Sequence, residues 1–255
     1  MISVYKRYRA VYWAVGIACI LCSAVCTYYF PKYIIAVISL MAIIIFSTVM
    51  ILMRATKNKF KNEVMSLLYD CRAQDYIEKV ESLLGKRRSN NLRSTYSWLM
   101  ALGYEVIGDF ETMREHCMNI TKKSHRSEYH RRMCIYYVEK NEIELANKEI
   151  ESLKLLAEAA KGPEKTHLSF YIGECVRAVK IKTNDIEGLD QYFASSGMAN
   201  NPVLLTRVSV AETSGCVLLR LGKTEEARKQ LEFASKYGGD TKFKRYADTL
   251  LGTIN

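Results

Sequence analysis

Hydrophobic residues gather in two long runs near the N-terminus. Two apolar stretches of about 21 residues each fill positions 10–30 and 33–53, and Lys32 is the one charged residue in the whole span. An α-helix rises ~1.5 Å per residue, so each stretch is long enough to cross the ~30 Å hydrocarbon core of a bilayer. Lipid cannot satisfy free backbone groups, and Pro31 favours a tight reversal. We therefore predict that residues 1–54 form a hairpin of two membrane-spanning helices, with spans at about 10–30 and 33–53.

The distribution of lysine and arginine predicts the orientation of this hairpin. Basic residues precede the first span and follow the second, whereas the turn carries only Lys32. The positive-inside rule then places both termini, and everything after the hairpin, in the cytoplasm. A cleaved signal peptide is the competing interpretation of the first span, but its apolar length exceeds a typical h-region and a second span follows at once.

After the hairpin, residues 55–255 show apolar positions at helical spacing and no strand-like alternation. Prolines there occur only at Pro163 and Pro202, each between helical stretches. Five predicted turns between helices follow one another at spacings of 34, 33, 43 and 38 residues; they lie at Gln74, Gly108, Asn141, Asn184 and Gly222. Self-similarity at such a period indicates a helical repeat.

The last of these units carries the clearest pattern. Small and apolar residues recur on both sides of its turn, at Gly215, Leu218, Gly222, Ala227, Leu231 and Ala234. This pattern resembles the tetratricopeptide repeat (TPR), whose units of about 34 residues each pair two antiparallel helices. The resemblance implies an all-α fold: an α-solenoid of about five helical hairpins with a capping helix at 241–252. The fourth unit fits the register least well, because insertions near Gly162 and Pro202 stretch its spacing.

The resemblance also implies where a partner binds. In this family the first helix of each unit lines a concave groove that takes a peptide or a partner helix. Carried over to this sequence, the candidate binding residues are Lys61, Val64, Arg72, Trp98, Leu102, Glu105, Arg131, Ile135, Glu139, Glu212, Cys216 and Arg220. Trp98 is the strongest candidate anchor because tryptophan is enriched in binding hot spots, although packing between repeats explains it equally well.

Charge and cysteine usage exclude several other functions. Residues 1–93 carry 14 basic and 5 acidic side chains, and residues 94–255 carry 23 and 22, so the basic excess lies next to the predicted membrane. The cysteines outside the hairpin stand singly, which predicts neither zinc nor a disulfide framework. Cys19, Cys22 and Cys26 share one face of the first span, where small residues would let the second helix approach closely. No catalytic or phosphate-binding motif occurs, so we predict no enzyme, no cofactor and no metal.

The sequence thus predicts a membrane-anchored scaffold that recruits a protein or peptide partner through its groove. Two alternatives remain open. The chain is an accessory subunit of a larger membrane complex, held mainly by its hairpin, or it binds anionic lipid or nucleic acid through basic patches. The patches in question are Lys86, Arg87, Arg88 and Arg93, together with residues 122–132. Nucleic acid is the weaker of these last two ligands, because the basic excess lies where a membrane already explains it.

Overall fold

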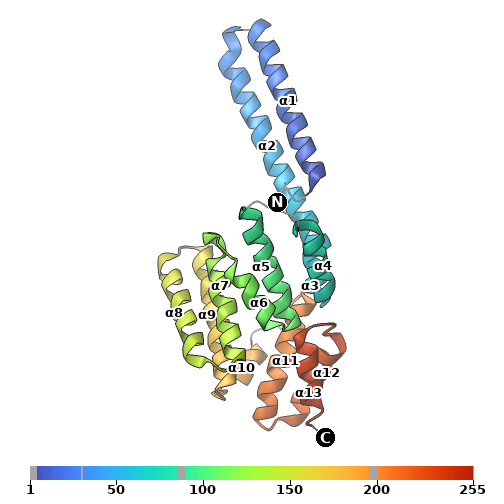
Figure 1. The fold of residues 1–255 in the computed structure, drawn as a ribbon, viewed down its shortest axis with the longest axis vertical. Helices are drawn as coiled ribbons and strands as arrows, with labels where there is room; N and C mark the ends of the chain where they lie inside the picture. The colour runs from blue at the N-terminus through green and yellow to red at the C-terminus, as the bar shows by residue number, and fades with distance from the viewer. Residues whose placement is uncertain (1–4, 30, 86–89, 196–199, 255) are drawn as a thin grey trace. The chain divides into compact units, whose positions relative to one another are not determined.

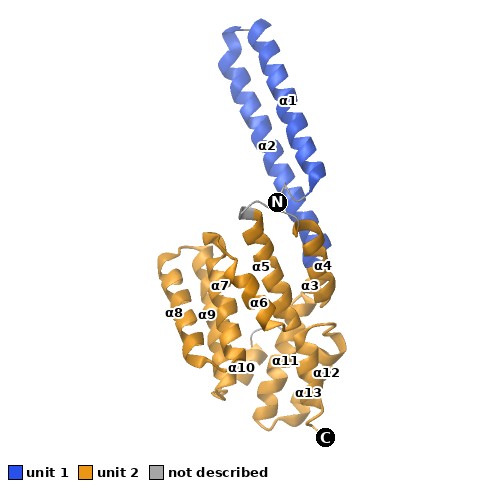
Figure 2. Cartoon of the chain, viewed as in Figure 1, with its two compact units in different colours: residues 1–66 blue, residues 67–255 orange. Residues whose placement is uncertain are grey.

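The computed structural model describes residues 5–29, 31–85, 90–195 and 200–254. Of residues 90 and 91, it describes the backbone only. All regular structure within these ranges is helical. The chain divides into two compact units, residues 1–66 and 67–255 (Figure 2). This boundary lies later than the 54/55 boundary that we predicted, because helical backbone continues past the end of the apolar run.

The first unit is a pair of antiparallel helices (Figure 1). Its helices are α1 (Lys6–Tyr29) and α2 (Ile34–Phe60), joined by the short 3₁₀ turn η1 (Pro31–Tyr33) and followed by the π-helical turn η2 (Lys61–Met65). Both α1 and α2 are long and apolar enough to cross a membrane. Large apolar side chains such as Trp13, Ile35 and Phe46 are exposed along them. Cys19 is buried but Cys22 is exposed, so the three cysteines of α1 do not share one buried face.

The second unit is a succession of helices that pack against their neighbours in the chain (Figure 1). Their bounds are α3 (Ser66–Tyr69), α4 (Ala73–Leu84), α5 (Asn90–Ile107), α6 (Phe110–Met118), η3 (Lys123–His125), α7 (Arg126–Glu139), α8 (Ile143–Ala159), α9 (Pro163–Lys182), α10 (Leu189–Ser195), α11 (Leu204–Arg220), α12 (Thr224–Tyr237) and α13 (Lys242–Leu251).

Five turns in the second unit share one local structure. In each, a residue with positive φ ends a helix, and the N–H of the next residue donates to the carbonyl five positions earlier at 2.8–3.0 Å. This is the Schellman termination, which glycine and asparagine favour because they tolerate the left-handed region. The positive-φ residues are Cys71, Gly108, Asn141, Asn184 and Gly222. The last four are the turn residues that we predicted, whereas the first turn lies at Cys71 and not at Gln74, which is inside α4.

The buried side chains of the second unit form a series of clusters between adjacent helices. One cluster joins α5, α6 and α7, a second joins α7, α8 and α9, and a third lies mainly among α11, α12 and α13. At the crossing of α11 and α12, a Cβ on Gly215 would lie 2.7 Å from Leu231 Cγ. The helices approach closely there because position 215 has no side chain, as the sequence pattern suggested.

The C-terminal segment returns to the first hairpin of this unit. Asp240, in the loop before α13, accepts hydrogen bonds from the backbone N–H groups of Ala73 and Gln74 at the start of α4, both at 2.7 Å. The Arg245 side chain donates to the carbonyl oxygen of Ile107 at the end of α5. Helix α13, which we predicted as a cap on the last hairpin, therefore also contacts the second one. The C-terminal end of the second unit thus contacts its N-terminal helices α4 and α5.

Candidate functional site

The second unit contains a groove of about 520 Å³, which we call the central groove. Its walls are α5, α7, α9, α10, α11 and α13. Because α13 contacts α5, the last of the lining helices meets the first of them. Apolar side chains cover most of its surface, among them Leu102, Ile135, Phe170 and Phe243.

Eight of the twelve candidate binding residues predicted from the sequence line the central groove. They are Leu102, Glu105, Arg131, Ile135, Glu139, Glu212, Cys216 and Arg220. They come from α5, α7 and α11, which are the first helices of the second, third and fifth predicted hairpins. The structure thus brings together residues that are up to 118 positions apart in the sequence.

The other four candidates lie elsewhere. Lys61 and Val64 belong to η2 in the first unit, where Val64 is fully buried. Arg72 precedes α4, and its guanidinium pairs with Asp75 at 2.6 Å on the surface. Trp98 stacks on the imidazole of His125, with ring centroids 4.7 Å apart and an interplanar angle of 7°. Trp98 does not line the central groove, and its stacking on His125 is the kind of packing that we considered as the alternative to a binding anchor.

Residues of α9 and α13 also line the groove, and the sequence analysis named none of them. Those on α9 include Glu174, Ala178 and Lys182, which stand ten, six and two positions before the turn residue Asn184. The predicted residues of α7 and α11 have the same offsets from Asn141 and Gly222. Counting back from each turn would have found the α9 residues. No such rule covers α13, since it belongs to no hairpin.

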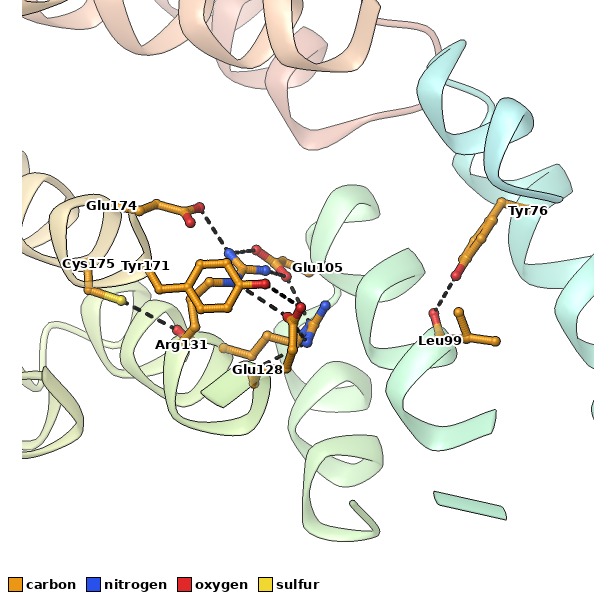
Figure 3. Close-up of polar contacts among 9 residues, drawn as sticks. Tyr76, Leu99, Glu105, Glu128, Arg131, Tyr171, Glu174 and Cys175 are labelled. Atoms are coloured by element: carbon orange, nitrogen blue, oxygen red, sulfur yellow. Dashed lines mark hydrogen bonds and ion pairs between the residues drawn. The ribbon is translucent and has the colours of Figure 1, made fainter. Parts of the chain in front are cut away.

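One wall of the groove contains a buried ionic network that joins α5, α7 and α9 (Figure 3). Arg131 of α7 makes a bidentate pair with Glu105 of α5, at 3.0 and 2.6 Å, and its Nη1 lies 2.9 Å from Glu174 of α9. Arg132 pairs with Glu105 at 3.1 Å and with Glu128 at 2.7 Å. Paired geometry of this kind offsets the cost of removing charges from water. Arg131 therefore serves the groove wall and is not free to clamp a ligand.

The network keeps its carboxylates ionised. Burial alone would raise the pKa of Glu105, but the charges of Arg131 and Arg132 outweigh burial and hold that pKa at about 2. The pKa of Glu128 is lowered for the same reason. The Tyr171 hydroxyl of α9 donates to Glu128, which adds a further bond between α7 and α9. These helices are held at fixed positions around the groove.

A second group of charges lies between α7, α11 and α13. Burial raises the pKa of Glu212 on α11 to about 7; Lys242 and the Thr213 hydroxyl, which donates to Glu212 at 3.2 Å, oppose this rise, and Glu139 adds to it. The Lys242 amine lies 4.7 Å from the centre of the Phe110 ring. Among the described residues, no lysine, arginine or histidine nitrogen is within 4 Å of the Glu139 or Glu212 carboxylate.

The basic segment at 122–132 is only partly exposed, with Lys123 and Arg126 at the surface. Arg131 and Arg132 are buried in the ionic network. His130 Nδ1 lies 2.6 Å from Glu149, and the Lys122 amine donates to Thr95. Of the other predicted patch, Lys86, Arg87 and Arg88 lie outside the described residues, whereas Arg93 is exposed.

The described part of the chain contains no metal-binding cluster, although the buried thiols of Cys134 and Cys175 lie next to each other. No three histidine, cysteine, aspartate or glutamate side chains there come close enough to hold an ion. All eight cysteines are free thiols. Burial raises the pKa of Cys216, the one thiol that lines the groove, which makes it a weak nucleophile.

Comparisons with family models, with curated proteins and with solved structures found no match for this chain.

Proposed function

We propose that this protein is a membrane-anchored interaction scaffold of the TPR-like kind, whose central groove binds a peptide or helical segment of a partner protein. The observation that carries the proposal is the groove itself, which is walled by the inner helices of successive hairpins and covered mainly by apolar side chains. Phe170 on α9 lines it and keeps 50% of its surface exposed. An exposed aromatic ring in a concave surface is a common anchor for a partner.

The size of the groove restricts the partner. A volume of about 520 Å³ accommodates several side chains of one segment but no folded domain. The ionic network of α5, α7 and α9 and the return of α13 to α5 fix the walls, so little ordering entropy is lost when a segment binds. Preorganised walls of this kind favour recognition of a short segment over enclosure of a large surface.

The hairpin supports the membrane anchoring that we propose. Its two helices expose large apolar side chains on all sides, which is stable in lipid and unfavourable in water. The positive-inside rule orients both termini and the second unit toward the cytoplasm. Confinement to a membrane raises the effective concentration of a bound partner near other membrane proteins without any new contact.

Photo-crosslinking from within the groove tests the binding half. A photoreactive amino acid at Phe170, in the full chain in its own membrane, is expected to capture a discrete partner. The matched control is the same probe at Leu155, which is equally apolar and 67% exposed but does not line the groove. Once the partner is identified, a Phe170→Asp change should weaken its non-covalent binding at least about tenfold, because it places a charge against the apolar surface. Equal capture from both positions would contradict a groove-binding scaffold.

Exchange of the hairpin separates the scaffold from the accessory subunit. Residues 1–54 are replaced by an unrelated two-span anchor of the same orientation, and the partner is captured again through Phe170. A scaffold keeps its partner after this exchange, because the contacts lie in the groove. Loss of the partner with an intact groove would identify the hairpin as the main interface and overturn the proposal.

The predicted topology has its own test. In sealed vesicles with the outer face exposed, we expect added protease to leave the second unit intact and to degrade it only after the membrane is opened. Degradation in sealed vesicles would place the second unit on the other side and remove the basis for a cytoplasmic partner.

A further inference from the structure

The carboxylates of Glu139 and Glu212 lie in the central groove without a basic partner. Glu139 ends α7 and Glu212 lies in the middle of α11, and each influences the ionisation of its neighbours across the groove. The cation that acts on Glu212 is Lys242, whose amine lies over the Phe110 and Phe243 rings. Two carboxylates and one amine leave a net charge of −1 in this part of the groove when all three are ionised.

The other charges of the groove are engaged with the chain itself or with solvent. On α5, α7 and α9, Glu105, Arg131 and Glu174 are bonded to one another. Arg177 lies over the Tyr192 ring at 4.5 Å, and Arg220 donates to the Ile181 carbonyl. Lys182 and Arg220 are exposed, so water solvates them. Tyr246 on α13 interacts with Glu139 and has a pKa raised to about 12, mainly by burial and then by that charge, so it stays protonated.

Glu212 thus combines partial burial with an incomplete charge balance. Its surroundings disfavour the ionised form, with burial the largest cause and Glu139 an additional one. A positive charge brought beside these carboxylates would reverse that effect, since an opposite charge within ~4–6 Å favours the ionised form. An anion would meet one buried cation here, Lys242, together with two carboxylates that repel it. Charge complementarity therefore favours a cationic group at this point of an otherwise apolar groove.

We infer that the central groove takes a partner segment in which apolar side chains surround one lysine or arginine, and that this cation binds between Glu139 and Glu212. This inference rests on the proposed function and adds the chemistry of the partner to it. The apolar part of the segment packs against Ile135, Phe170 and Phe243. The cation fixes where along the groove the segment binds.

The same arrangement makes binding depend on pH. Glu212 is the lining group that changes charge between pH 6 and pH 8, and no histidine lines the groove. When a cation binds, Glu212 releases its proton, so affinity rises with pH. For a pKa of about 7, the ionised fraction rises from ~10% at pH 6 to ~90% at pH 8, which predicts a change of about tenfold in affinity. A purely apolar segment would bury Glu212 further and bind more weakly as the pH rises.

The experiment is a selection from a display library of random 16-residue peptides without histidine, on the full chain in phospholipid nanodiscs at pH 8. Peptides that bind the wild type but not the Phe170→Asp variant are kept as groove-dependent. We expect these peptides to carry lysine or arginine at one fixed position among apolar residues. A chosen peptide should bind the wild type about tenfold more tightly at pH 8 than at pH 6. Its affinity for the isosteric Glu212→Gln variant should be lower at pH 8 and independent of pH.

The outcomes separate this inference from the function on which it rests. Groove-dependent peptides without a fixed cation, or with tighter binding at pH 6, overturn the cation site and leave the scaffold in place. Absence of any groove-dependent peptide overturns both. Replacing the selected lysine by norleucine provides the partner-side control and should remove the pH dependence from wild-type binding. Circular dichroism of Glu212→Gln checks that the variant is folded.

Discussion

Replacing Arg131 with methionine is expected to lower the free energy of unfolding by about 3–5 kcal/mol, because breaking a buried ion pair leaves its partner charge uncompensated. The carboxylate of Glu105 is buried and loses its bidentate partner in this variant. Arg132 remains 3.1 Å away but already serves Glu128 as well. Methionine fills a similar volume to the aliphatic part of arginine, so the change removes charge more than packing. Urea unfolding in mild detergent, followed by circular dichroism, measures the effect.

The pH dependence of stability distinguishes this ionic cause from a packing defect. The pKa of Glu105 is about 2 in the folded protein, below its ordinary value of 4.5, so the unfolded chain binds more protons between these values. Stability from this group is present above pH 4.5 and is lost as the pH falls toward 2. In Arg131→Met, the charge that opposed the effect of burial is lost, so the pKa of Glu105 rises. The variant should therefore lose less stability than the wild type when the pH falls from 5 to 3.

The matched control is Arg72→Met. Arg72 also pairs with a carboxylate at 2.6 Å, but 60% of its side chain is exposed, and such surface pairs contribute ~0–1 kcal/mol. A destabilisation of Arg131→Met no larger than that of Arg72→Met would show that the network does not hold the groove wall. It would also remove one reason for treating the groove as preorganised.

The turns show what the sequence can predict of this fold and where prediction stops. Gly108, Asn141, Asn184 and Gly222 were recognisable because glycine and asparagine adopt positive φ at low cost. Cys71 has φ of +59° without being such a residue, so nothing in its type marks it. Its conformation is fixed by tertiary contacts, because it is buried against α11, α12 and α13. The conformational preference of a single residue does not reflect contacts with helices so far away in the sequence.

The groove was predictable where it follows from the repeat and unpredictable where it does not. Residues of α7 and α11 were found because they occupy fixed offsets before a turn, and α9 was missed only because insertions obscured its register. The contribution of α13 depends on the return of the chain to α5, which no local pattern encodes. Arg131 is buried and Arg220 is exposed, and this difference was not predictable from the sequence either. The two arginines look alike in sequence, and the difference is that Glu105 and Glu174 surround the first.

The closure of the second unit depends on Gly239, and we expect Gly239→Ala to destabilise it by roughly 3 kcal/mol, since strained φ and overpacking each cost ~1–3 kcal/mol. Gly239 has φ of +56°, where a Cβ is disfavoured in any surroundings. In addition, that Cβ would lie 2.1 Å from the carbonyl oxygen of Cys71, a backbone atom that cannot rotate away. The segment before α13 must therefore move, which pulls Asp240 from the N–H groups of Ala73 and Gln74.

Gly222→Ala separates strain from closure. Gly222 has a similar φ of +76°, yet nothing lies within 4 Å of the position of its Cβ. That variant should lower the free energy of unfolding by about 1–2 kcal/mol, which is the effect of backbone strain alone. Hydrogen exchange then locates the damage: in Gly239→Ala, the amides of Ala73 and Gln74 should exchange much faster, while Gly222→Ala leaves them protected. Equal stability and equal protection in the two variants would mean that the contact of Asp240 with α4 does not hold the row of helices closed. The position of α13 in the groove wall would then depend on its contacts with α5, α11 and α12 instead.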